Sequence, residues 1–263
     1  MNRRHFLFDC EGVQLAATLD DGAATVGLLL VSGGNEVRAG AWNGQAKFAA
    51  RIAVQGYPVM RFDRRGVGDS EGENGEFRSS APDIASALTA FRRECPQLTK
   101  IVAFGNCDAA SALMLSCGMG IGAGIDAMVL SNPWTIEDDA QEEPAEVVRD
   151  HYRRRLTDPA AIRRLLTGKV SIGKLLRSLL SAARPASAGL SGLAAEMAEG
   201  IATYRGCIRF LVAARDRTGQ AFLAKWNKSD TRIRICPDAT HSYVELHAQD
   251  WLVEQVIAVL EAQ

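Results

Sequence analysis

The stretch IVAFGNCDAASALML, residues 101–115, changes character at a single cysteine. Its first half is apolar and favours a buried strand, whereas its second half is rich in alanine and favours a helix. Cys107 lies at the junction, with Gly105 two residues before it and Ala109 two residues after it. A sharp strand-to-helix turn lifts a side chain out of the sheet and needs small neighbours on both sides. Because a helix N-terminus favours negative charge, this position predicts a nucleophilic thiolate at Cys107.

Apolar runs that resemble residues 101–106 recur along the chain and alternate with helical segments. We expect strands in two short stretches within 3–20, and in 25–34, 56–63, 100–106, 127–133, 207–216 and 231–242. We expect helices in 42–55, 81–94, 107–118 and 248–262. Strands that are apolar throughout and alternate with helices are typical of a doubly wound parallel sheet, so the expected class is α/β. Right-handed crossovers then gather the loops that follow the strands at one edge of the sheet.

One long stretch, 135–204, contains no convincing strand and interrupts the alternation. It begins with an acidic run, continues with a strongly basic region and shows helical spacing of apolar residues in two places. We therefore expect a core formed by 1–134 and 205–263, with 135–204 as a helical cap over the loop-bearing edge. Its basic side chains would attract an anionic substrate, and the alternative is an ordinary solvated surface. The substrate-binding candidates in this cap are Arg153, Arg154 and Arg155.

Composition excludes several classes of protein. The chain has 263 residues, of which 47% are hydrophobic, and its formal net charge of −1 gives no support to nucleic-acid binding. We expect neither a signal peptide nor a membrane span, because the apolar runs are too short. The six cysteines lack metal-binding spacing, so we expect a cytoplasmic protein without metal or cofactor. Five of the six are expected to be buried core thiols, and the oligomeric state is left open.

Two further residues have the right order and context to assist Cys107. Asp216 ends the apolar run 207–216, and His241 follows the last expected strand and precedes the last helix. Nucleophile, acid and base in this chain order form a catalytic triad. His241 would take the proton of the thiol and later activate water, while Asp216 would orient the imidazole and stabilise its charged form.

A tetrahedral intermediate formed at Cys107 needs two backbone N–H donors for its oxyanion. One donor is expected at Asp108, directly after the nucleophile. The other is expected at Gly34 or Asn35, in the loop that follows the strand in 25–34. The neighbouring glycines give this loop the freedom to approach closely, although a plain glycine turn is the alternative.

The stretch RFDRRGVGDSEG, residues 61–72, strongly resembles the R-x-D-x-R-G-x-G-x-S loop of the α/β-hydrolase superfamily. Together with GNCDAASAL and ARDRTGQAF, it also resembles the type 1 hydrolases associated with the exosortase A system of bacteria. The resemblance covers nearly the whole chain and implies an α/β-hydrolase fold with a mostly parallel, eight-stranded sheet, helices on both faces and a cap. It also implies a link to exopolysaccharide synthesis and protein sorting, and a mostly structural role for 61–72.

Two positions depart from the superfamily pattern. The nucleophile is cysteine rather than serine, as in dienelactone hydrolases, and Ala109 replaces the usual glycine. We expect hydrolysis of a small-molecule ester, thioester or lactone through a covalent acyl-enzyme. Two alternatives stay open: acyl transfer to another acceptor by the same triad, and a non-catalytic accessory or binding protein on a hydrolase fold.

Overall fold

The protein is described here from a computed structural model that covers residues 2–136, 192–227 and 229–263. Eight strands form one sheet in the order β1-β2-β4-β3-β5-β6-β7-β8, and only β2 runs antiparallel to its neighbours. The strands are β1 (Arg3–Cys10), β2 (Val13–Asp20), β3 (Val26–Val31), β4 (Val59–Phe62), β5 (Lys100–Asn106), β6 (Ala127–Ser131), β7 (Cys207–Ala213) and β8 (Ile233–Cys236).

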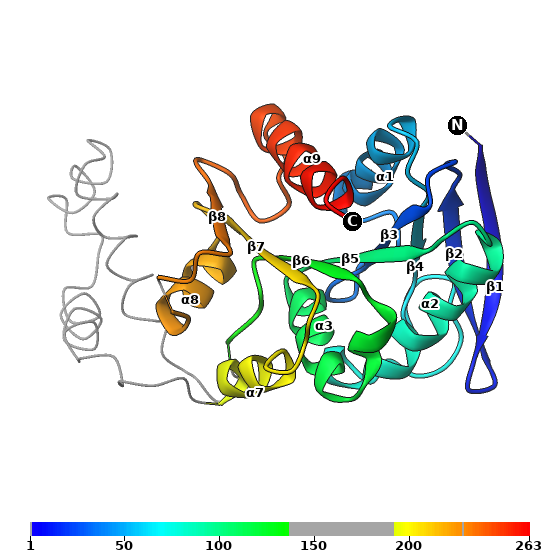
Figure 1. Ribbon diagram of the computed structural model, residues 1–263. Coiled ribbons are helices and arrows are strands. Elements are labelled where there is room, and N and C mark those ends of the chain that lie inside the picture. The colour runs from blue at the N-terminus through cyan, green and yellow to red at the C-terminus, as the bar shows by residue number, and fades with distance from the viewer. Residues whose placement is uncertain (1, 137–191, 228) are drawn as a thin grey trace, which may run out of the picture.

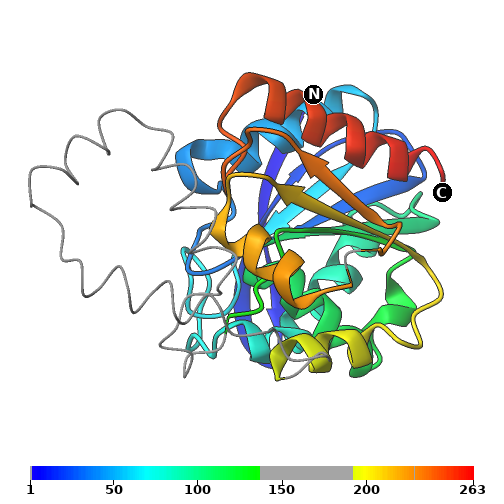
Figure 2. The same ribbon diagram turned by 90° about the vertical axis from the view of Figure 1, so that its left-hand side faces the viewer.

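Helices cover both faces of this sheet (Figures 1 and 2). Helices α1 and α9 lie on one face, and α2, α3, α7 and α8 lie on the other. The described helices are α1 (Gly44–Val54), α2 (Ala81–Glu94), α3 (Asp108–Gly118), α7 (Leu193–Gly200), α8 (Arg217–Lys225) and α9 (Leu246–Leu260). Short 3-10 turns are η1 (Ala41–Asn43), η2 (Phe77–Ser79) and η3 (Ile121–Gly124).

The central strands are apolar throughout because both of their faces are buried. Leu28, Leu29 and Leu30 of β3 are each fully buried. Successive side chains of a strand point to opposite faces, so Leu29 packs under α2 and α3 whereas Leu28 and Leu30 pack under α1 and α9. Each such leucine contributes about 1.5–3 kcal/mol of burial free energy. The two apolar layers therefore fix the sheet between the helices.

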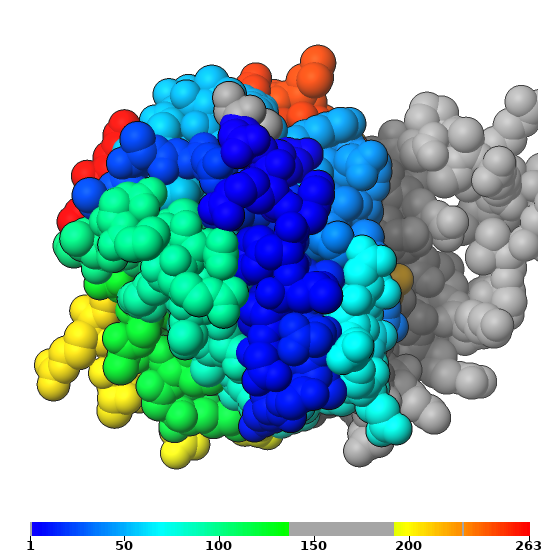
Figure 3. Space-filling model, turned by 90° about the vertical axis from the view of Figure 1, so that its right-hand side faces the viewer, coloured from blue at the N-terminus to red at the C-terminus, as the bar shows by residue number. Residues whose placement is uncertain are grey.

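The two edges of the sheet differ from its centre. The β1–β2 hairpin forms one edge and is uncovered on its outer face (Figure 3), where Leu7 is 56% exposed. Strand β8 forms the other edge, and Ile235 is exposed there. Within the part of the chain that the structure describes, no helix is both long and apolar enough to span a bilayer.

The predicted α/β-hydrolase architecture is confirmed, with two differences from the expected helices. Helix α8 was not expected, and the predicted helix in 42–55 is divided into η1 and α1. Of the predicted cap 135–204, residues 137–191 lie outside the described residues. Its last part contains α7, which packs on α3, with Gly200 so close to Met114 that no side chain would fit. The bounds of the cap remain predictions.

Candidate active site

Cys107 lies on the turn between β5 and α3, in a backbone conformation that is uncommon outside glycine, with φ of 64°. A Cβ atom at Gly105 would lie 2.7 Å from the backbone carbon of Ala109, and Ala109 itself is fully buried. Small residues are therefore required on both sides of the turn, as predicted. The thiol of Cys107 is partly exposed, so a substrate can reach it.

His241 and Asp216 meet beside this thiol. His241 lies in the loop between β8 and α9, and its Nδ1 atom is 2.9 Å from Oδ2 of Asp216. The side chain of Cys107 is the second group that interacts with this imidazole. The hydrogen bond to Asp216 and then the interaction with Cys107 raise the pKa of His241 from 6.5 to about 10, against the opposing effect of burial. The structure thus brings together the three residues that the chain order singled out.

The Asp216 carboxylate is fixed by the helix that follows it. Asp216 is the N-cap of α8 and accepts hydrogen bonds from the backbone N–H groups of Thr218 (3.2 Å) and Gly219 (2.9 Å). These two hydrogen bonds fix the orientation of the carboxylate at the helix N-terminus. Helix α8 therefore has a direct part in orienting His241, and the sequence analysis had missed it.

Asn132, directly after β6, links the strand ends that carry these residues. Its Nδ2 atom is 3.0 Å from Oδ1 of Asn106 and 3.4 Å from the backbone oxygen of His241. Its Oδ1 atom accepts the N–H of Ala213 at 2.8 Å. The side chain is fully buried, and its backbone has φ of 42°. Asn132 thereby holds the His241 loop against the ends of β5 and β7.

Sequence reasoning did not find Asn132. In the sequence it precedes Pro133 at the end of an apolar run, where an asparagine ordinarily marks a turn. A second hydrogen bond nearby, between Ser131 Oγ and Tyr243 Oη at 2.9 Å, was also not predicted from the sequence. Only the packing of β6 against the His241 loop shows what these side chains contact.

The predicted oxyanion donors adjoin Cys107, but one of them already has a partner. The backbone N–H of Gly34 donates to Oδ1 of Asp108 at 2.5 Å. A Cβ atom at Gly33 would lie 2.5 Å from the backbone oxygen of Asn106 and 2.8 Å from the same Asp108 oxygen. The absence of a side chain at Gly33 thus lets this loop approach Asn106 and Asp108 closely. Gly34 adopts a left-handed backbone conformation, with φ of 58°. The side chain of Asp108 thus occupies one of the two alternative donors, Gly34 and Asn35, that were expected in this loop.

Arg64 is the second group that contacts the Asp108 carboxylate. Its Nη2 atom is 3.5 Å from Oδ2 of Asp108 and donates to the backbone oxygen of Gly34, while Nη1 donates to Ser80 Oγ at 2.9 Å. Arg64 is 4% exposed. This arginine lies within the motif loop 61–72, yet the sequence analysis gave it no part in the site.

The rest of the motif loop is structural, in line with the expectation. Asp63 accepts hydrogen bonds from the backbone and guanidinium of Arg38 and from the N–H of Asp69 at 3.0 Å. Gly68 adopts φ of 58°, and a Cβ atom there would overlap the Asp63 carboxylate. The glycines therefore let the loop wrap around one buried carboxylate.

A cavity of about 870 Å³ adjoins the thiol on the side of the sheet that faces α3 and α7. Cys107, Asp108 and Gly34 line it together with Asn35, and its mixed walls also include Arg64, Glu76, Phe77, Arg78, Trp134, Ile136 and Leu193. Two of these lining residues, Ile136 and Leu193, belong to the described ends of the predicted cap 135–204. Arg153, Arg154 and Arg155 lie outside the described residues.

The other thiols differ from Cys107, and one differs from its prediction. Cys10, Cys95, Cys117 and Cys236 are buried, and burial raises the pKa of each, to about 11 for Cys95 and Cys117. Cys207 is exposed, so the expectation of five buried thiols is wrong there. It begins β7 near the edge of the sheet, where the first residue of a strand is not covered. In the described part of the chain, no cluster of three potential metal ligands occurs.

Comparison with protein families agrees with this architecture. Residues 28–255 match the model of the family described as "Alpha/beta hydrolase family". The chain belongs to the alpha/beta hydrolase family. Membership of this family supports hydrolase activity. Comparison with curated proteins finds no match.

Several solved structures share the fold at low sequence identity. An esterase from Pyrococcus furiosus, Pf2001, is 14% identical with a TM-score of 0.61, over 99% of this chain and 91% of the esterase. Est1E from Butyrivibrio proteoclasticus, solved with ferulic acid, is 14% identical with a TM-score of 0.59, over 96% of this chain and 99% of the other. A thioesterase domain from the curacin biosynthetic pathway is 15% identical with a TM-score of 0.56, over 98% and 100%.

Proposed function

We propose that the protein hydrolyses a carboxylic ester, thioester or lactone through a covalent thioester on Cys107. The observation that supports this most directly is the series of interacting side chains from Asp216 through His241 to Cys107, at the edge of a large cavity. Family membership supports the reaction class, and the fold is shared with esterases and a thioesterase domain. The intact series argues against a purely non-catalytic role.

In this proposal the sulfur of Cys107 attacks the carbonyl carbon, and the carbonyl π electrons move to oxygen. His241 holds the thiol proton as an imidazolium that stays paired with Asp216; the raised pKa of His241 makes this charged form the stable one at neutral pH. The tetrahedral intermediate collapses, the carbon–oxygen or carbon–sulfur bond breaks, and the imidazolium protonates the leaving group. Water, deprotonated by His241, then cleaves the thioester and releases the acid.

The oxyanion of the intermediate requires a free donor beside the backbone N–H of Asp108. We propose that the Asp108 side chain leaves Gly34 when substrate binds and pairs with Arg64, which is already 3.5 Å away. Replacing Asp108 by alanine would then free the donor permanently. We expect Asp108→Ala to raise kcat/KM for a neutral ester, whereas a loss would show that the carboxylate assists the reaction.

The decisive test of the function is turnover by Cys107 variants. We expect Cys107→Ala to lower kcat on p-nitrophenyl acetate and on an acetyl thioester by at least about 10³-fold, because the nucleophile is lost. Its free energy of unfolding should hardly change, because the side chain is only partly buried. Intact-mass measurement after rapid quenching should find one added acetyl group on the unchanged chain and none on Cys107→Ala.

The exposed Cys207 supplies an internal control for the thiol chemistry. Every variant is best made on a Cys207→Ser background, so that adventitious acylation of an exposed thiol does not count as turnover. Acylation or full turnover that persists in Cys107→Ala on this background would place the chemistry elsewhere and overturn the proposal.

A biological role for this activity is suggested only by the resemblance of its motifs to the exosortase-associated hydrolases. We propose a cytoplasmic role in exosortase-linked or exopolysaccharide metabolism, on a small acyl substrate that is anionic if Arg153, Arg154 and Arg155 line its entrance. Acyl transfer would divert the acyl group from water to an added alcohol or amine. The ratio of free acid to acylated acceptor therefore separates a transferase from a hydrolase.

A further inference from the structure

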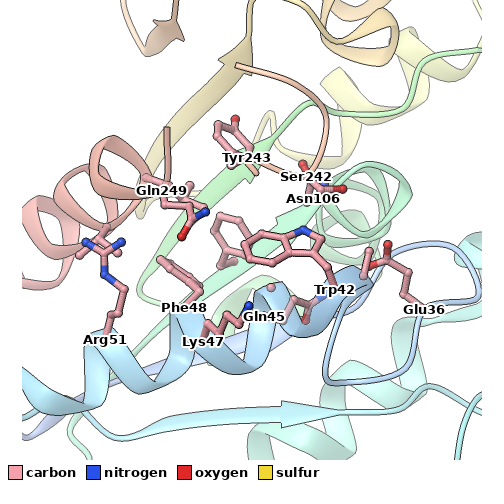
Figure 4. Close-up of a pocket in the computed structure, with 15 residues that line it drawn as sticks. Glu36, Trp42, Gln45, Lys47, Phe48, Arg51, Asn106, Ser242, Tyr243 and Gln249 are labelled. Atoms are coloured by element: carbon pink, nitrogen blue, oxygen red, sulfur yellow. The ribbon is translucent and has the colours of Figure 1, made fainter. Parts of the chain in front are cut away.

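A second cavity, the Trp42 pocket, opens on the opposite face of the sheet, between α1 and α9 (Figure 4). Its volume is about 70 Å³, against about 870 Å³ for the cavity beside Cys107 and Asp108. The share of liquid volume taken by one water molecule is about 30 Å³, so the pocket accommodates a group of roughly two to four carbon atoms. Among the residues that the structure describes, no expected site residue lines it.

The pocket nevertheless begins next to the proposed nucleophile and base. Asn106, directly before Cys107, and Ser242, directly after His241, both line it. In Figure 4 the indole of Trp42 lies among the lining residues, close to Asn106 and Ser242. Cys107 lines the large cavity and its immediate neighbour in the chain lines the small one, so the two cavities flank the turn that carries the nucleophile.

The interior of the Trp42 pocket is mainly apolar, although Gln45, Asn106, Ser242 and Gln249 also line it. Phe48 of α1 and Phe104 of β5 pack with their ring centroids 5.5 Å apart, and Leu252 and Val253 of α9 close the opposite wall. The charged side chains lie toward solvent, where Arg51 pairs with Asp250 at 2.7 Å. Such walls favour an uncharged hydrocarbon group over a charged or strongly hydrated one.

Trp42 is held over the pocket in a strained conformation. Trp42 and Asn43 both have left-handed backbones, with φ of 50° and 60°. Each such non-glycine residue costs on the order of 1–3 kcal/mol and is tolerated mainly where a site requires it. The residue is 38% exposed, Lys47 lies 4.6 Å from the ring centre, and a Cβ atom at Gly44 would be 3.0 Å from the indole. The half-exposed indole therefore forms part of the pocket wall and not of the buried core.

We infer that the Trp42 pocket is the acyl subsite of the enzyme and takes a short, uncharged alkyl chain of about two to four carbons. This inference rests on the proposed function and adds the substrate class. The large cavity has mixed walls that include the charged residues Arg64 and Glu76, and it suits a bulky polar leaving group and the attacking water. The small apolar pocket suits the hydrocarbon that stays attached to Cys107 in the acyl-enzyme.

The test compares acyl chain lengths in two opposite variants. Trp42→Gly removes the indole while fitting the left-handed backbone, and Val253→Phe fills the pocket from α9. Each methylene that enters the pocket should change kcat/KM about fourfold. For p-nitrophenyl acetate, butyrate and octanoate, the unchanged protein should prefer butyrate. Trp42→Gly should shift preference toward octanoate, and Val253→Phe should lower the butyrate-to-acetate ratio about tenfold.

The matched control is Val54→Phe, which makes the same change on α1 at a residue that is 74% exposed and does not line the pocket. It should leave the chain-length profile unaltered. If Trp42→Gly and Val253→Phe also leave it unaltered while Cys107→Ala abolishes turnover, the subsite is wrong and the proposed function stands.

A binding measurement decides the subsite even if no ester in the series is cleaved. Saturation-transfer NMR with butyramide on Cys107→Ala should detect binding that Val253→Phe weakens at least fivefold and Val54→Phe does not. Absence of butyramide binding, or binding that Val253→Phe leaves unchanged, would overturn the assignment of this pocket.

Discussion

Two buried aspartates at the same edge of the sheet, Asp63 after β4 and Asp216 after β7, are held in similar ways. Asp63 is 0% exposed and Asp216 is 6% exposed. Each accepts two hydrogen bonds from backbone N–H groups of its own or a neighbouring loop. They differ in the cationic partner, which is the Arg38 guanidinium for Asp63 and the His241 imidazole for Asp216.

The partner decides what each carboxylate can do. A guanidinium keeps its charge at every accessible pH, and Arg38 also pairs with Asp69 at 2.9 Å, so the Asp63 cluster is closed. An imidazole gains and loses a proton, and the His241 side chain is 38% exposed at the edge of the site. The two carboxylates are therefore buried in similar ways, but Asp63 stabilises the fold whereas Asp216 can support proton transfer by His241. Substitution of Asp216 should therefore lower kcat, whereas substitution of Asp63 should lower the free energy of unfolding.

The largest expected effect is on activity, from Asp216→Asn. Asparagine still caps α8, so the free energy of unfolding should fall by less than about 1 kcal/mol. It does not stabilise the imidazolium, so kcat should fall about 10³- to 10⁴-fold, as in other triads. Steady-state kinetics with matched urea unfolding measures both. A large stability loss at unchanged kcat would make Asp216 a structural residue like Asp63.

The next effect is on stability, from Asp63→Ala. Removing this carboxylate leaves Nη1 of Arg38 and the backbone N–H groups of Arg38 and Asp69 without the acceptor they share, so the free energy of unfolding should fall by about 3–5 kcal/mol. Folded enzyme should keep its kcat at low temperature. Urea titration and kinetics on the same sample check this, and selective loss of kcat in a stable protein would contradict the comparison.

A smaller effect is expected from Asn132→Asp. The aspartate still accepts the N–H of Ala213, but it cannot donate to the backbone oxygen of His241 or to Asn106. The base should then be displaced, with kcat falling about 10- to 100-fold at nearly constant KM.

The control for Asn132 is Asp126→Ala at the other end of β6. Asp126 accepts the N–H of Ile101 at 2.8 Å, so its loss should cost a comparable amount of stability far from the site. If both variants lower kcat equally, Asn132 acts through general stability and not through the position of His241.

The smallest effect is a pH dependence of stability. Because the pKa of His241 is raised from 6.5 to about 10, its charged form stabilises the fold fully below about pH 6.5, and this contribution is lost as pH rises toward 10. Solvent screening of the 38% exposed side chain keeps it on the order of 1 kcal/mol. The unfolding free-energy gap between the unchanged protein and Asp216→Asn should therefore be larger at pH 6 than at pH 10. An equal free-energy gap at both pH values would contradict the proposed coupling between the charges of His241 and Asp216.

Much of the fold was predictable because local sequence and burial agree. Residues 100–106 are almost entirely apolar, because both faces of this strand are covered by helices. Such a run is therefore recognisable in the sequence as a central strand. The limits of α2 follow from Pro82 in its first turn and an apolar face at helical spacing. Helix α8 was missed because its sequence, RTGQAFLAK, holds glycine and threonine in the first turn and only a short apolar face.

The sequence by itself determined the turn at Cys107, the chain order of Cys107, Asp216 and His241, and the strands that bring them to one edge. These depend on local sterics and on the fixed hand of the crossovers. The tertiary structure alone decided that Asp108 occupies the Gly34 donor, that Asn132 holds the His241 loop, and that Trp42 covers a second pocket. Each of these contacts joins segments far apart in the chain, and no pattern within one segment encodes its partner.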